Sequence, residues 1–211
     1  MHETIKEVSD RSAIRSRHQN CNWEQSTMAD MTTLETKLAD MKLFQKLVLE
    51  SEEKLMVATN DGTIRERLEG MVKSDRDNLA TIENILSKLG TTTDSRELTK
   101  QYAEKIGQMM DGSELSLYDK FFELELLKHQ QAMAGLVIHK VAQSLSDQLQ
   151  DAVEPLNKVN FENRAHQEVL KGILYFVGTR EMAGTEPDMG LVGSLEQAIA
   201  AVKGAVGSAV S

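Results

Sequence analysis

Four long stretches of this chain repeat their apolar residues at steps of three and four, which is the period of an amphipathic helix. They begin near Thr32, Thr63, Ser113 and Glu154, and their stripes continue to Leu55, Leu89, Gln143 and Val177. Helix-forming Leu, Met, Ala, Glu, Lys and Gln dominate the composition, and the only prolines are Pro155 and Pro187. The pattern predicts an all-α fold, a four-helix bundle with short turns between most of its helices.

The breaks between these stretches carry turn and cap signals. Asn60, Asp61 and Gly62 end the first stretch, and Gly90 follows the second where a left-handed cap is expected. A shorter helix is predicted over 96–110, between core helices 2 and 3. It could be the long crossover connection of a ferritin-like bundle or an addition to a simple up-down bundle of the hemerythrin-like kind. The spacing allows both.

Three regions follow from the changes in pattern. Residues 1–30 have no sustained period, and we expect a flexible N-terminal extension, in which Arg11, Arg15, Arg17 and His18 lie close together. Translation could also begin at Met28, just ahead of the first regular helix. Residues 31–183 form the bundle. Residues 184–211 are expected to form a C-terminal loop and one appended helix.

Charge and cysteine content narrow the classes of partner. The formal net charge is -9 with no clustered basic surface, so we expect no nucleic-acid partner. A single cysteine, Cys21, indicates a reducing compartment. No apolar run reaches the roughly 20 residues that a membrane span needs. We therefore expect a cytoplasmic protein without integral membrane association.

The four apolar stripes also contain polar residues at positions that should face the core. A buried carboxylate costs several kcal/mol unless it is paired or bound to a cation. With about 1.5 Å of rise per residue, the polar positions of all four helices can meet in one zone at mid-bundle. These positions are Gln45, Glu52, Asp75, Asn78, Glu125, His129, Asn163 and His166, with Glu162 at the edge of its stripe.

The most specific feature in this zone is a doubled Glu-x-x-x-His, formed by Glu125 with His129 and by Glu162 with His166. Residues four apart share a helix face, so each pair could reach one ion. Mixed carboxylate and imidazole ligands suit iron, manganese or zinc. The predicted site holds one or two ions, iron or manganese first, on Glu52, Asp75, Glu125, His129, Glu162 and His166. The alternative is a metal-free hydrogen-bonded network that fixes the packing register.

A family resemblance accompanies these motifs. Glu125-Leu-Leu-Lys-His129, the segment from Met133 to His139-Lys140 and the segment from Pro155 to Glu168 are similar to cyanobacterial-type proteins of the hemerythrin-like (HHE cation-binding) or ferritin-like group. The resemblance covers the chain from about residue 32 onward. It implies a four-helix bundle and non-haem iron, and it implies no particular reaction.

Two functions remain open at this stage. The first is a ferritin-like metal-binding protein in metal handling or the response to oxidative stress. The second is a metal-free interaction or dimerisation module with a structural polar core. Small residues on one side of the C-terminal segment, Ser194, Ala198, Ala201 and Ala205, would let helices approach closely and fit a homodimer. The preferred interpretation of this segment itself is that it packs on its own bundle. Neither function fixes whether the chain is an enzyme.

Overall fold

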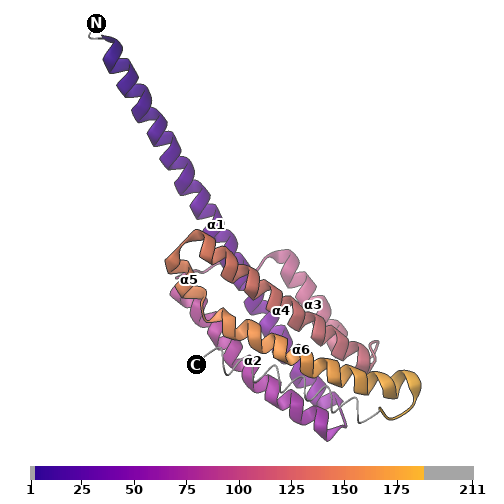
Figure 1. Ribbon diagram of the computed structural model, residues 1–211. Helices are drawn as coiled ribbons and strands as arrows, with labels where there is room; N and C mark the ends of the chain where they lie inside the picture. The colour runs from indigo at the N-terminus through magenta and orange to yellow at the C-terminus, as the bar shows by residue number, and fades with distance from the viewer. Residues whose placement is uncertain (1–2, 188–211) are drawn as a thin grey trace.

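The computed structural model describes residues 3–187, which contain helices and no strand (Figure 1). The predicted all-α fold is confirmed. The elements in chain order are α1 (Glu3–Ala58), α2 (Gly62–Lys88), α3 (Glu97–Asp111), α4 (Leu117–Leu145), α5 (Asp147–Val153), α6 (Leu156–Gly178) and the short π-helix η1 (Thr179–Ala183).

The bundle is built from α1, α2, α4 and α6. Each of these helices packs against two others, because α1 contacts α2 and α4, and α6 contacts the same pair. The remaining long element, α3, lies outside the bundle along α1 (Figure 1). The Ser95 hydroxyl donates to the Ala39 carbonyl near one end of α3, and Asp111 pairs with Lys54 at the other. The connection from α2 to α4 therefore runs along the length of the bundle. Of the two predicted topologies, this is the one with a long crossover connection and not the simple up-down bundle.

Local sequence signals explain several helix ends. The Asp61 carboxylate accepts hydrogen bonds from the backbone N–H groups of Thr63 and Ile64 at the start of α2. Ser116 and Asp119 form a reciprocal capping box at the start of α4. Gly90 has a φ of 66°, a left-handed conformation that glycine adopts without a Cβ penalty. The predicted turn at 60–62 and the predicted end at Gly90 are confirmed.

Two details of the helix order differ from prediction. The short helix expected over 96–110 is present as α3, but α5 was not predicted. A seven-residue helix spans only two turns, too few to give a measurable apolar period. Ser146 caps α5 through its hydroxyl, and Pro155 separates α5 from α6.

The two ends of the chain were predicted to lie outside the bundle. Residues 3–30 form the first half of α1, which continues without interruption to Ala58. In Figure 1 this half projects beyond the other helices. The segment 188–211, with most of the predicted C-terminal loop and helix, lies outside the described residues. Among residues 3–187, no helix is both long and apolar enough to cross a membrane.

The apolar core is divided into two clusters along the bundle. The first contains Leu68, Phe121, Leu124 and Leu170, and the second contains Leu38, Ile82, Ile138 and Leu156. Between them each bundle helix contributes buried polar side chains. These are Gln45 and Glu52 on α1, Asp75 and Asn78 on α2, Lys128 and Gln131 on α4, and Asn160, Asn163 and His166 on α6. The predicted mid-bundle polar zone is therefore present.

Candidate functional site

Lys128 lies at the centre of the polar layer and is fully buried. Its ammonium nitrogen lies 2.8 Å from Glu52 Oε1 and 2.9 Å from His166 Nδ1, and it makes a short ion pair with Asp75. Burial alone would lower the pKa of Lys128, but the two carboxyl groups outweigh it and raise the pKa. The lysine is thus a buried cation that joins its own helix, α4, to three others, α1, α2 and α6.

Asp75 is the main counter-charge to this lysine. Its Oδ1 accepts from Gln45 Nε2 at 2.7 Å and from Asn78 Nδ2 at 3.2 Å, while Oδ2 faces Lys128 and His166. Burial alone would raise the pKa of this carboxyl, but the Lys128 charge and the His166 hydrogen bond lower it well below its usual range. Asp75 is therefore ionised and fully hydrogen-bonded.

Glu52 has a different environment, although it is equally buried. Its Oε1 lies within ion-pair distance of Lys128, yet neither carboxyl oxygen accepts a hydrogen bond of normal geometry. Burial raises the pKa of Glu52 well above its usual value, and the neighbouring Asp75 charge adds to the rise, while Lys128 opposes it. The Lys128 ammonium and the Asp75 carboxylate therefore form the central ion pair, with the Glu52 carboxyl group beside them.

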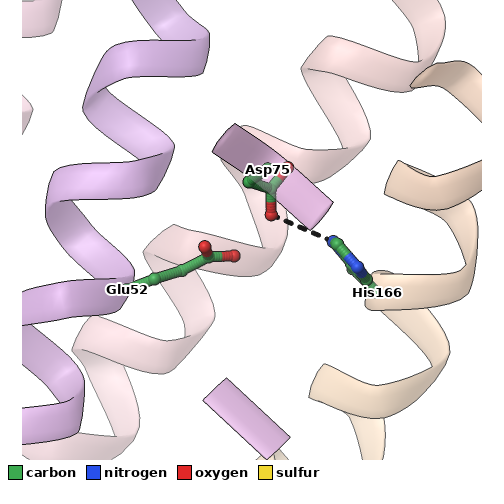
Figure 2. Close-up of side chains that lie close together, drawn as sticks. All are labelled: Glu52, Asp75 and His166. Atoms are coloured by element: carbon green, nitrogen blue, oxygen red, sulfur yellow. Dashed lines mark ion pairs between the residues drawn. The ribbon is translucent and has the colours of Figure 1, made fainter. Parts of the chain in front are cut away.

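His166 connects this buried cluster to the seam between α2 and α6. Its Nδ1 lies 3.1 Å from Asp75 Oδ2, the pair joined by the dashed line in Figure 2, and its Nε2 lies 2.9 Å from the Ser74 hydroxyl oxygen. Asp75 is completely buried, His166 is 8% exposed and Ser74 is partly exposed. A polar chain thus runs from the buried acid outward to a serine hydroxyl.

The structure brings together three of the six predicted metal ligands. Glu52, Asp75 and His166 each offer a ligand atom, and these atoms lie within 4.8 Å of one another. The Lys128 ammonium contacts all three side chains, so a protein cation holds the position that a metal ion would take. A metal ion can bind there only if this ammonium leaves. Iron or manganese binding at these residues stays a prediction.

The other three predicted ligands lie apart from this group. Glu125 is partly exposed and His129 is exposed, and both contact Gln167 on the outer side of the α4–α6 seam. Glu162 is half-buried, with Lys158 at 3.6 Å. Burial raises the pKa of Glu162, although Lys158 opposes the rise. The doubled Glu-x-x-x-His therefore does not form one site.

The core-facing stripe predicted for the third helix was displaced by one position. It passed through Glu125 and His129, whereas the buried face of α4 passes through Phe121, Leu124, Lys128 and Gln131. The sequence has neighbouring apolar pairs at 121–122 and 126–127, so either of two adjacent helix faces could be the buried one. A lysine is also an improbable core residue unless its partners are known. The spacing of Lys128 from Phe121 and Leu124, seven and four residues, was the signal that could have identified it.

Polar groups arranged in this way can hold a proton or stabilise a negative charge, but they do not name a substrate. The chain is 44% identical over 175 residues, 83% of its length, to a protein of Nostoc sp.. That relative is named DNA nickase. The chain spans half of the relative's length. No protein-family description matches the chain, and no solved structure matches it.

This relative overturns several expectations drawn from the sequence. The resemblance to hemerythrin-like or ferritin-like proteins was wrong, and so was the metal-handling function derived from it, because a relative at 44% identity has a DNA-related name. The alternative of a metal-free interaction module fails for the same reason. The exclusion of nucleic acid was also wrong, since net charge averages over the whole surface and does not report local charge. The expected homodimer has no support within residues 3–187.

Proposed function

We propose that this chain acts on DNA and takes part in cutting one strand of a duplex. The single observation that carries the proposal is the 44% identity to a DNA nickase over 83% of the chain. Because the chain corresponds to half of that relative, the activity of the whole relative is not assumed for it. The single cysteine suits a reducing compartment, and we place the activity in the cytoplasm.

The first half of α1 is the element best suited to contact the DNA backbone. Between residues 11 and 23 the sequence has three arginines, Arg11, Arg15 and Arg17, and no Asp or Glu. This local charge of +3 contrasts with -9 for the chain. The segment is helical and projects beyond the bundle (Figure 1). Helices that enter the major groove from a larger assembly bind DNA in this manner, and arginines neutralise the phosphates.

Binding and cutting can be measured separately. Fluorescence anisotropy with a labelled duplex should show binding that weakens as salt increases, because phosphate contacts release counterions. Supercoiled plasmid should be converted to the open-circular form, with linear DNA appearing only later. A protein that neither binds the duplex nor nicks the plasmid would contradict the proposal.

A charge-matched pair of variants tests the role of α1. Replacing Arg11, Arg15 and Arg17 with Gln should lower the affinity for DNA by roughly 10-fold or more and reduce the salt dependence. The control replaces three exposed lysines of the bundle, Lys88, Lys105 and Lys140, with Gln, which changes the net charge by the same amount. If both triple variants lose affinity equally, the N-terminal helix is not the contact element.

A further inference from the structure

Ser74, His166 and Asp75 form a hydrogen-bonded series with the order found in nucleophilic catalysis. The Ser74 oxygen lies 2.9 Å from His166 Nε2, and Asp75 Oδ2 lies 3.1 Å from the other ring nitrogen. A hydroxyl is a weak nucleophile until an adjacent base accepts its proton, and that base needs a third group to orient it. Ser74, His166 and Asp75 lie in the positions that these three roles require.

The burial of the three residues follows the same order. Asp75 is inaccessible and ionised, whereas Ser74, the outermost member, is partly exposed at the α2–α6 seam. A nucleophile must lie at the exposed end, since a substrate has to reach it.

We propose that Ser74 is a nucleophile toward a phosphodiester, with His166 as its general base and Asp75 as the residue that orients the imidazole. The substrate class rests on the proposed function, a DNA strand that is cut at one phosphate. The nucleophile itself rests on the geometry of these three side chains.

The reaction requires no further reactant for cutting. The Ser74 hydroxyl gives its proton to His166 Nε2, and the oxygen forms a bond to phosphorus. One phosphorus–oxygen ester bond breaks, and the departing DNA hydroxyl takes the proton from His166. The product is a phosphoserine ester that holds one strand end. Water, or the departed hydroxyl, can then attack the phosphorus and return Ser74 to its starting state.

The reaction requires one particular tautomer of His166, and Lys128 lies beside the ring nitrogen concerned. For Nε2 to accept from Ser74, Nδ1 must carry the hydrogen and donate it to Asp75. In the opposite tautomer Nδ1 accepts from the Lys128 ammonium, 2.9 Å away, whereas in the reactive tautomer the ammonium directs its hydrogens to Asp75 and Glu52. Asp75 Oδ2 therefore accepts from both groups. Lys128 acts as a positioning residue, because it holds Asp75 where His166 needs it.

The competing arrangement is a Ser74 hydroxyl that serves only its own helix. Ser74 Oγ also lies 3.1 Å from the Met71 carbonyl and 3.3 Å from the Gly70 carbonyl, where its hydrogen could point instead. In that arrangement the serine would show no unusual reactivity. Chemical labelling distinguishes the two.

The first experiment treats the folded full-length chain with a fluorophosphonate and identifies the product by intact-mass and peptide mass spectrometry. One phosphonyl group should be found on Ser74, and Ser74→Ala should lose it. His166→Gln should slow labelling by roughly 100-fold or more, the usual contribution of a general base. Ser87→Ala, an exposed serine on the same helix, is the matched control and should label normally. Wild-type protein that is not labelled at Ser74 overturns the proposal.

The second experiment uses supercoiled plasmid and denaturing conditions that preserve covalent bonds. Wild type should leave protein attached to one strand of the nicked DNA, and Ser74→Ala should leave none while keeping its thermal unfolding midpoint. Full nicking by Ser74→Ala would overturn the nucleophile and leave the proposed function intact. Labelling of Ser74 without binding or nicking of DNA would retain the nucleophile and count against the proposed function.

Discussion

A lysine without access to water is the residue on which the centre of this protein depends. Moving an ammonium from water into the interior costs several kcal/mol, which is recovered only when opposite charges and hydrogen bonds surround it. Lys128 has these partners on three different helices: Glu52 on α1, Asp75 on α2 and His166 on α6. Its own helix therefore cannot shift along its axis without breaking contacts to all the others.

Removing this ammonium should destabilise the fold strongly. Lys128→Ala leaves the Asp75 carboxylate buried without its cation, and we expect a loss of about 3–5 kcal/mol in the free energy of unfolding. Urea unfolding followed by circular dichroism gives this value. Lys140→Ala, an exposed position on the same helix, should change it by less than about 0.5 kcal/mol. Equal effects at the two positions would contradict the assignment of Lys128 as the central counter-ion.

The same substitution tests the predicted metal ligands. Once the ammonium is removed, Glu52, Asp75 and His166 surround a space with ligand atoms within 4.8 Å of one another. Manganese or zinc should then raise the thermal unfolding midpoint of Lys128→Ala more than that of the wild type, because a ligand that binds only the folded state stabilises it. The same small shift in both proteins would count against a cation site at these residues.

Glycine 135 allows close contact between α4 and α6. A Cβ at this position would lie 1.8 Å from the Asn160 side-chain oxygen and 3.0 Å from the Met41 methyl group. Gly135→Ala must therefore displace a buried side chain, and we expect a destabilisation of about 1–3 kcal/mol. Gly70→Ala is the control within a helix, since a Cβ there would meet no atom within 4 Å. It should stabilise by up to about 1 kcal/mol. Calorimetric unfolding of the pair checks both signs.

At the level of helices, periodicity predicted most of the fold and only part of the site. The turn at 60–62, the end at Gly90 and the short helix α3 followed from local chemistry that neighbouring residues determine. The buried face of α4 did not follow from local chemistry, because the burial of Lys128 depends on two carboxyl groups that lie on other helices. Ser74 was missed for a similar reason, since its significance comes from His166, 92 residues away.

The start of α2 offers a test of pH dependence. Burial alone would raise the pKa of Asp61, but hydrogen bonds from the Ile64 N–H, from Arg180 and from the Thr63 N–H, together with the Arg180 charge, lower it. A lowered folded-state pKa gives stability that is present above the unfolded value of about 3.9 and lost as pH falls through the folded value.

Asp61→Asn keeps a capping oxygen but removes the charge. The variant should therefore be less stable than the wild type at pH 7 by up to about 1 kcal/mol, and the difference should shrink toward pH 3. Thermal unfolding midpoints at several pH values measure this. A difference that does not depend on pH would indicate that the ion pair with Arg180 contributes nothing.

At the level of the whole molecule, the bundle and the projecting half of α1 are separable. The buried core of the region whose side chains are described, 31–187, begins at Leu34. A chain that begins at Met28 should therefore unfold at nearly the same temperature as the full chain, within about 2 °C. Its affinity for duplex DNA should fall by at least as much as that of the triple arginine variant. A large loss of thermal stability would mean that the first 27 residues pack on the bundle.

Under the proposed function, α1 would also measure distance along the DNA, because it is one uninterrupted helix. Arg17 and Glu52 lie about 35 residues apart on the same helix, which corresponds to roughly 50 Å along its axis. Straight duplex DNA covers this length in about 15 base pairs. DNA held by the arginines would therefore present to Ser74 a phosphate more than one helical turn away from the bound segment, unless the duplex bends back. The cut would fall at a fixed offset from the sequence that is bound, set by the length of a single helix.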